Sequence, residues 1–181
     1  MGRGALAGPV IASAVILPPK TKIYNLKDSK KLNDINRRNI LKIIKKKAIE
    51  YSIASASSNE IDKINIFNAS LLAMKRAIKS LKNKPDYILI DGFYLPNLKI
   101  NNNGIIKGDN KFLTISAASI CAKVFRDDLM IKMSKKYKNY YFEKNKGYGT
   151  KSHIENIKKY NSCELHRKTF NPIKNFFKDN V

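Results

Sequence analysis

The sequence contains very little cysteine and histidine, with two residues of each. Cys121 and Cys163 lie far apart and form no CxxC pair, and neither His153 nor His166 has a metal-type spacing to them. A zinc site is therefore not expected. Two unpaired cysteines fit a reducing cytosol, so we predict a cytoplasmic protein with free thiols.

A long hydrophobic run is also missing. No apolar stretch reaches the ~18 residues that a membrane span requires. The segment MGRGALAGPVIASAVIL at the start has some features of a signal peptide, but Pro9 interrupts it and no clean A-x-A cleavage site follows. We predict instead a glycine-rich turn that leads into a buried strand from Val10 to Leu17, apolar on both faces.

Acidic residues are scarce. The chain has 14 of them against 36 basic residues, which gives a net charge of +22 among 181 residues. This balance favours a polyanionic partner, most simply nucleic acid. Thirty of the 36 basic residues are lysine, so bias in an AT-rich genome is an alternative source of much of this excess.

Three of these few acids are predicted to point inward. Asp91 directly follows a short strand, Tyr87–Ile90, and Asp109 follows two isoleucines in the segment KGD. Asp127 shares the apolar face of a predicted helix with Ile120. Converging carboxylates in a basic protein need a cation, and oxygen-only ligands suit Mg²⁺ or Mn²⁺.

Strands and helices mix along the chain in the manner of an α/β sandwich. A helix is predicted from Asn33 or Asp34 to about Tyr51, and a strand from Tyr51 to Ala56. A helical turn follows over 60–64. The next helix carries an apolar stripe that we predict to be core: Phe67, Leu71, Met74, Ile78 and Leu81. A final helix is predicted over 151–160.

The segments IDG, KGD and SAASICAKVFRD, in that order, resemble the core of type 2 ribonuclease H, the bacterial ribonuclease HII family. The resemblance continues in MGRGALAGPV, LKDSKKLN, EIDKINIFNASLLAMKRA, NKGYGTKSH and HRKTF, and it covers about residues 2–172. It implies one catalytic domain over 1–181, with a helical, substrate-contacting part from about 135. The implied fold is ribonuclease H-like: a mixed five-stranded sheet flanked by helices, whose first strand we expect to be missing.

The resemblance further implies an endoribonuclease that cuts the RNA strand of RNA–DNA hybrids and incises at single ribonucleotides in duplex DNA. The implied chemistry is two-metal-ion hydrolysis with Mn²⁺ or Mg²⁺, which leaves 5′-phosphate and 3′-hydroxyl ends. Asp91 and Asp109 match two of the four carboxylates that the family uses as catalytic metal ligands. The other two, an adjacent Asp-Glu pair, are expected directly before Met1, either because the true start lies upstream or because the product is truncated.

Without that pair, the alternative is a catalytically impaired protein that binds RNA–DNA hybrids. A nonspecific basic DNA-packaging protein would explain the charge but not the paired acids. We expect a monomer that acts on nucleic acid, with a sliding clamp as a candidate partner.

Other residues match the family in substrate contacts. The resemblance assigns substrate binding to Gly2, Arg3, Gly4, Ser29, Lys30, Lys31 and Tyr148. The glycine turn would lie against the ribose 2′-OH, which distinguishes RNA from DNA, and Tyr148 would stack on the neighbouring deoxyribose. Arg126 and Asp127 match a supporting pair beside the site. Taken alone, GRG is a simple turn, the Ser-Lys-Lys run a solvated loop, and Asp127 a hydrogen-bonded structural acid.

Overall fold

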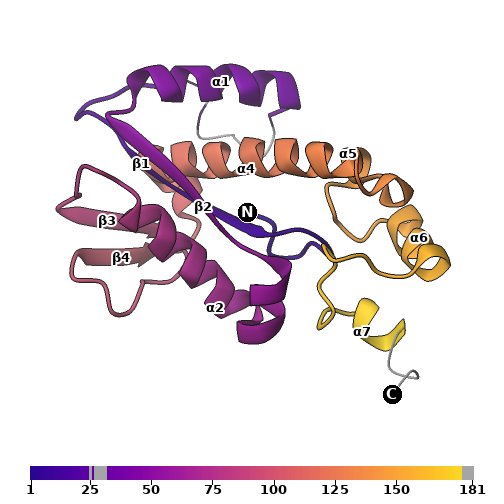
Figure 1. The fold of residues 1–181 in the computed structure, drawn as a ribbon. Helices are drawn as coiled ribbons and strands as arrows, with labels where there is room; N and C mark the ends of the chain where they lie inside the picture. Colours follow the sequence, from indigo (N-terminus) through magenta and orange to yellow (C-terminus); the bar gives the residue numbers. More distant parts are fainter. Residues whose placement is uncertain (25, 27–31, 177–181) are drawn as a thin grey trace. The chain divides into compact units, whose positions relative to one another are not determined.

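A computed structural model describes residues 1–24, 26 and 32–176 (Figure 1). Its chain mixes strands and helices. The elements in chain order are β1 (Val10–Ile16), α1 (Asp34–Lys47), β2 (Glu50–Ala56), α2 (Ser58–Lys79), β3 (Tyr87–Asp91), β4 (Asn101–Ile105), α3 (Gly108–Lys111), α4 (Leu113–Ser134), η2 (Lys138–Tyr140), α5 (Phe142–Asn145), α6 (Lys151–Tyr160) and α7 (Ile173–Phe176).

The chain divides into two compact units. Unit 1 comprises Met1–Ile11, Ser55–Leu72 and Phe125–Val181, and unit 2 comprises Ala12–Ala54 and Ala73–Val124. Each unit is therefore assembled from segments that are distant in sequence. A single catalytic domain over the whole chain stays a prediction.

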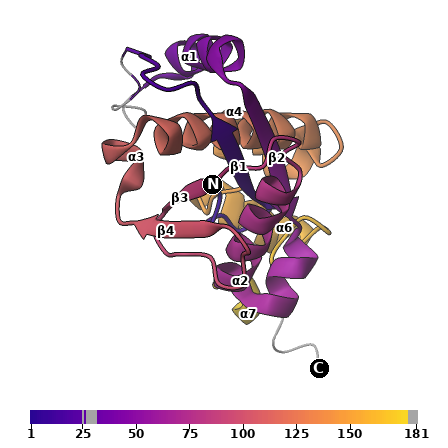
Figure 2. The same cartoon turned by 90° about the vertical axis from the view of Figure 1, so that its left-hand side faces the viewer.

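Four strands form two separate pairs within the described residues: β1 with β2, and β3 with β4. The second pair is parallel, with Tyr87 opposite Asn101 and Asp91 opposite Ile105, and the two strands lie side by side in both ribbon views (Figure 2). The predicted five-stranded sheet is therefore wrong for the described part of the chain. The residues by themselves predict three strands, Val10–Leu17, Tyr51–Ala56 and Tyr87–Ile90, and the five-stranded sheet comes from the resemblance alone.

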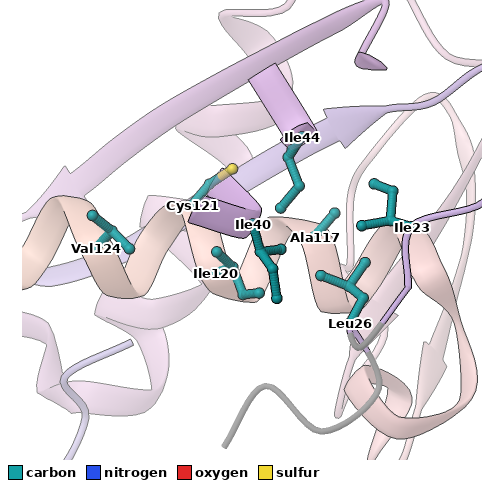
Figure 3. Packing of buried hydrophobic residues seen from close by; sticks show 8 residues of the cluster. All are labelled: Ile23, Leu26, Ile40, Ile44, Ala117, Ile120, Cys121 and Val124. Carbon is teal, nitrogen blue, oxygen red and sulfur yellow. The ribbon is translucent and has the colours of Figure 1, made fainter. Parts of the chain in front are cut away.

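A hydrophobic cluster in unit 2 joins α1 to the first half of α4 (Figure 3). Ile40 and Ile44 of α1 meet Ala117 and Ile120 of α4, and all four are buried. Burying a large aliphatic side chain contributes ~1.5–3 kcal/mol, so this cluster fixes α1 on α4. Ile43, one turn from Ile40, is 42% exposed and lies outside this cluster.

Helix α1 begins and ends for local reasons. The Asn33 side chain accepts a hydrogen bond from the Asn36 amide at 2.8 Å, which caps the first turn. Three lysines occupy the last turn, where positive charge favours the helix dipole. The helix ends at Lys47, four residues before the predicted Tyr51, because β2 takes up the chain from Glu50.

Helix α2 merges two predicted elements across a kink. Asn65 has φ 64° and ψ 166°, and its side-chain oxygen accepts from the amides of Phe67 and Asn68, each at 3.0 Å. Beyond the kink, the fully buried positions include the small residues Ala69 and Ala73, whereas Phe67 is 42% exposed. The predicted large-residue stripe is therefore only partly the buried face.

Unit 1 has its own core, which includes the predicted helical C-terminal part. The cluster joins the N-terminal segment to α4, η2, α5, α6 and α7 through Leu6, Ala7, Met130, Tyr140, Phe142, Ile157 and Ile173. Through the described ranges, the helices are all too short or too polar to span a membrane.

Candidate active site

Asp91 and Asp109 lie at the carboxyl ends of the parallel strands β3 and β4. Asp91 is the last residue of β3, and its Oδ1 accepts a hydrogen bond from the Gly108 amide at 2.9 Å. Asp109 directly follows Gly108 at the start of α3, and its side chain is buried, with 2% exposed. The structure therefore brings the two predicted acids together at one edge of the pair, where parallel sheets commonly carry their sites.

Gly108 occupies a crowded position between the two acids. A Cβ atom there would lie 2.6 Å from Ile115 Cδ1 and 3.2 Å from Ile105 Cβ. Glycine avoids this crowding, and the Gly108 amide reaches the Asp91 carboxylate. In the segment KGD, the glycine fits against Ile105 and Ile115, and its amide forms the hydrogen bond to Asp91.

The two aspartates provide oxygen donors of the kind that Mg²⁺ and Mn²⁺ prefer. Within the described ranges, no three histidine, cysteine or acidic side chains gather as a metal-binding group. Asp91 and Asp109 thus fit a divalent cation by donor type, and they match two of the four carboxylates that the resemblance implies.

A buried arginine organises the predicted residues that belong to unit 1, which are Gly2, Arg3, Gly4, Arg126, Asp127 and Tyr148. Arg126 is 1% exposed. Its guanidinium donates to main-chain carbonyls: Ala7 at 3.1 Å, Pro9 at 3.2 Å and Lys146 at 2.8 Å. Arg126 therefore ties the N-terminal turn to the segment just before Tyr148.

Tyr148 lies against the same arginine. Its ring centroid is 5.2 Å from the Arg126 guanidinium carbon, in a cation–π contact, and the side chain is 37% exposed. The Tyr148 amide donates to the Asn145 carbonyl at 2.9 Å. One face of the ring is held while part of the side chain remains accessible to a ligand.

A second buried arginine, Arg167, was missed by the sequence reasoning. It is fully buried and bonds the carbonyl oxygens of Gly2 at 2.7 Å, Arg3 at 2.8 Å and Gly8 at 2.8 Å and 3.0 Å. Its only signal in the sequence was its place in HRKTF. Burial, and then the charge of Arg126, lower the pKa of Arg167. An arginine titrates so far above neutrality that it still carries its charge.

The remaining predicted residues have mixed placements. Arg3 and Gly4 are exposed. Asp109 and Asp127 are buried, which confirms their predicted inward position, whereas Asp91 is exposed at the end of β3, so its predicted inward position is wrong. Ser29, Lys30 and Lys31 lie outside the described residues. Asp91 and Asp109 belong to unit 2, whereas Gly2, Arg126 and Tyr148 belong to unit 1.

Comparison with known proteins decides the family. The description of the family that matches residues 1–173 is "Ribonuclease HII". The chain belongs to the ribonuclease HII family. This places it among hydrolytic nucleases, as the sequence motifs indicated.

Curated relatives named Ribonuclease HII support this assignment. One from Caldicellulosiruptor bescii is 52% identical over 169 residues, which cover 93% of this chain and 82% of the relative. One from Pelagibacter ubique is 53% identical over 174 residues, which cover 96% of this chain and 93% of the relative.

Solved structures show the same ribonuclease H-like fold, which confirms the predicted fold class. Ribonuclease H2 from Pyrococcus horikoshii has a TM-score of 0.80 at 22% identity, covering 99% of this chain and 94% of that one. A complex of PCNA with ribonuclease HII from Archaeoglobus fulgidus has a TM-score of 0.79 at 21% identity, covering 97% of this chain and 93% of that one. The Bst ribonuclease HIII complex with Mn²⁺ has a TM-score of 0.68 at 14% identity, covering 98% of this chain and 67% of that one.

The two glycines of the ribonuclease HII turn should respond differently to alanine. Gly2 has φ 84°, and a Cβ there would overlap the Arg126 side chain, whereas a Cβ on Gly4 meets nothing within 4 Å. We expect Gly2→Ala to lower the free energy of unfolding by ~2–4 kcal/mol through strain and displacement of Arg126. Gly4→Ala should change it by less than ~1 kcal/mol. Urea denaturation of both variants measures this, and equal losses would contradict the packing described for Gly2.

Proposed function

We propose that this chain degrades the RNA strand of RNA–DNA hybrids and incises duplex DNA at single ribonucleotides. The reaction is metal-dependent hydrolysis that leaves 5′-phosphate and 3′-hydroxyl ends. One observation carries the proposal. The Gly108 amide donates a hydrogen bond to Asp91, and this places the neighbouring Asp109 beside Asp91 at the carboxyl ends of β3 and β4. Membership of the ribonuclease HII family supports the coarser reaction, degradation of RNA in hybrids.

Asp91 and Asp109 are assigned to holding divalent cations. The Gly108 amide orients one oxygen of Asp91, and burial keeps Asp109 beside it. Bound Mn²⁺ or Mg²⁺ would supply an activated water and stabilise the departing oxyanion. The Bst ribonuclease HIII of similar fold was solved in complex with Mn²⁺, which supports a divalent cation in this fold.

Recognition of the ribonucleotide is assigned to Gly2, Arg3, Gly4 and Tyr148. The exposed Gly4 has open space where a side chain would be, so a sugar can approach the backbone there. Tyr148 offers an accessible ring whose position Arg126 fixes. Arg126 and Asp127 act in support. Ser29, Lys30 and Lys31 remain predicted phosphate contacts.

The rival interpretation, a hybrid-binding protein without catalysis, gains no support from the comparisons, because the relatives are named as ribonucleases. A sliding clamp is a proposed partner, since the Archaeoglobus protein of this fold was solved as a complex with PCNA. We also propose that the chain acts as a monomer.

Cleavage of four duplexes of one sequence tests the proposal: an RNA–DNA hybrid, DNA with one ribonucleotide, all-DNA and all-RNA. For this test a short apolar run ending in Asp-Glu is added directly before Met1, because the resemblance implies two carboxylates there. We term this the extended chain. With Mn²⁺ it should cut only the first two duplexes. Selective binding without cutting would favour the binding protein, and equal binding to all four would favour a nonspecific basic protein.

Tyr148→Ala should separate recognition from chemistry. Stacking of an aromatic ring on a nucleotide contributes ~1–3 kcal/mol, so cleavage at a single ribonucleotide in the extended chain should fall by roughly one to two orders of magnitude. Cleavage within a long hybrid should suffer less, because many phosphate contacts remain. The measurement is the ratio of the two cleavage rates at fixed salt.

The matched control replaces Lys42 and Lys46 on α1. Phosphate contacts carry no information about the sugar, so their loss should weaken both substrates alike and flatten the salt dependence. If Tyr148→Ala leaves the ratio of rates unchanged while the lysine variants alter it, Tyr148 does not read the ribonucleotide junction.

A further inference from the structure

Two histidines that the proposed chemistry does not use form a buried pair behind Tyr148. His153 of α6 is fully buried and His166 is 1% exposed. Their Nε2 atoms lie 3.1 Å apart, within hydrogen-bond distance. His153 Nδ1 lies 2.8 Å from the Tyr148 carbonyl oxygen. The pair therefore connects the backbone at Tyr148 to the segment after α6 that carries His166.

The neighbours of the pair fix which nitrogen carries each proton. The Cys163 amide donates to His166 Nδ1 at 2.9 Å, and the Cys163 thiol lies 3.2 Å from the same atom. His166 Nδ1 is therefore an acceptor, and in a neutral ring the proton is on Nε2. That proton is donated to His153 Nε2, which leaves the His153 proton on Nδ1 for the Tyr148 carbonyl. Each N–H donor in this series of hydrogen bonds therefore meets an acceptor.

This chain of bonds holds only while both rings are neutral. A proton added to His166 Nδ1 would face the Cys163 amide, and one added to His153 Nε2 would face the His166 N–H. Burial lowers the pKa of both rings, that of His166 to about 4, with His153 as a further cause. Aromatic rings pack against the pair. The ring centroid of Tyr140 lies 4.7 Å from that of His166, and the ring centroid of Phe142 lies 5.5 Å from that of His153.

The other titratable groups around the pair are neutral or engaged elsewhere. Burial raises the pKa of the Cys163 thiol and of the Tyr140 phenol, so both are uncharged where histidine titrates. Glu164 pairs with Lys136 at 3.0 Å. Arg167 bonds the carbonyls of the N-terminal turn.

We propose that His153 and His166 are positioning residues for ribonucleotide recognition. A one-way chain of hydrogen bonds from the Cys163 amide through both imidazoles to the Tyr148 carbonyl sets the turn that presents the Tyr148 ring. This inference rests on the proposed function, because the sugar contact of Tyr148 is assigned there. Arg126 holds the ring and the histidines hold the backbone beneath it.

Two amide variants at one position test this role. Asparagine reaches the place of a histidine Nδ1, so His153→Asn can still donate to the Tyr148 carbonyl. Glutamine reaches the place of Nε2, so His153→Gln contacts His166 but leaves that carbonyl without its side-chain donor. The measurement is the ratio of dissociation constants of the 181-residue chain for an all-DNA duplex and for the same duplex with one ribonucleotide, without metal.

We expect His153→Gln to lower the ratio about tenfold, the size of one lost hydrogen bond. His153→Asn keeps the contact to the Tyr148 carbonyl but loses the one to His166, so it should lower the ratio less. A role in packing alone predicts the opposite order, because glutamine is closer to histidine in volume. Equal ratios in both variants, or a lower ratio in His153→Asn than in His153→Gln, would overturn the proposal.

Nuclear magnetic resonance of the two histidine side chains tests the bond chain without any nucleic acid. Since the chain has only two histidines, we expect one neutral ring with its proton on Nδ1 and one with its proton on Nε2 at pH 7.5. Neither should titrate near the ordinary pKa of 6.5. Two rings of the same tautomer, or a ring protonated near pH 6.5, would overturn the relay. A wild-type chain with the expected tautomers but no preference for the ribonucleotide duplex would instead contradict the proposed function.

Acid should weaken the fold through this pair, and the sign follows from linkage. Both folded-state pKa values lie below the unfolded value, so the unfolded chain binds more protons below pH ~6.5. The stability that the pair contributes is complete above that pH and is lost as the pH falls toward about 4, the lowered pKa of His166. The urea midpoint of wild type should fall more steeply over this window than that of His166→Phe, and parallel curves would overturn the neutral relay.

Discussion

Asp109→Asn should reduce cleavage by the extended chain by at least roughly 10³-fold, and Asp91→Asn should do the same. Each substitution removes a negative oxygen that we assign to the metals and replaces it with a weaker neutral donor of the same shape. Binding of the RNA–DNA hybrid should stay intact or tighten, because a charge that repels phosphate is lost. Initial rates with Mn²⁺ and a separate binding titration distinguish the two effects.

Asp128→Asn is the matched control for this prediction. The same atoms change, but Asp128 is exposed on α4 and no metal role is assigned to it, so cleavage should change by no more than a few fold. Cleavage retained in Asp91→Asn would remove that residue from the site. Comparable losses in all three variants would mean that overall charge, rather than a metal site, controls the rate.

Arg167→Met should cause the largest loss of stability, about 3–5 kcal/mol in the free energy of unfolding. The side chain donates four hydrogen bonds to the carbonyls of Gly2, Arg3 and Gly8 from a fully buried position. Methionine fills much of the volume but donates nothing, so these carbonyls lose their partners. Lysine should not rescue the loss, because one ammonium cannot reproduce the planar, forked geometry of the guanidinium.

Arg38→Met supplies the contrast. Arg38 pairs with Asp34 at 2.7 Å on the exposed surface of α1, where its side chain is 36% exposed. A surface ion pair contributes ~0.2–1 kcal/mol, so the urea midpoint should move little. A midpoint for Arg167→Met as close to wild type as that of Arg38→Met would contradict the anchoring role of Arg167.

Local patterns predicted the parts of the structure that depend on neighbouring residues. The run before Asp91 predicted β3 because strand-forming side chains are followed by Gly92, and the phase of Asp127 predicted its burial because it lies on the apolar line of α4. The local pattern predicted Asn33 or Asp34 as the start of α1, and Asn33 is the cap. The resemblance added the roles of Asp91 and Asp109, which remain predictions that the geometry supports.

Long-range contacts explain what could not be predicted. Arginine is almost never fully buried, so nothing local indicated that Arg126 and Arg167 would lie inside unit 1. Their burial depends on carbonyls of the N-terminal turn, more than 100 positions away for each. The pairing of His153 with His166 likewise depends on how α6 and the following loop pack. The spacing of metal ligands in the sequence gives no indication of this pair, because the two rings are hydrogen-bonded to each other.

The most direct test of the account is the chemical identity of the ends formed on one duplex. The extended chain is incubated with Mn²⁺ and DNA that carries a single ribonucleotide, and the products are analysed by mass spectrometry. Hydrolysis by water predicts one cut at the ribonucleotide, with 5′-phosphate and 3′-hydroxyl ends, and no cut when a chelator removes the metal. Intact DNA in the presence of either Mn²⁺ or Mg²⁺, or a 2′,3′-cyclic phosphate end, would contradict the account, the latter because it requires attack by the neighbouring 2′-hydroxyl.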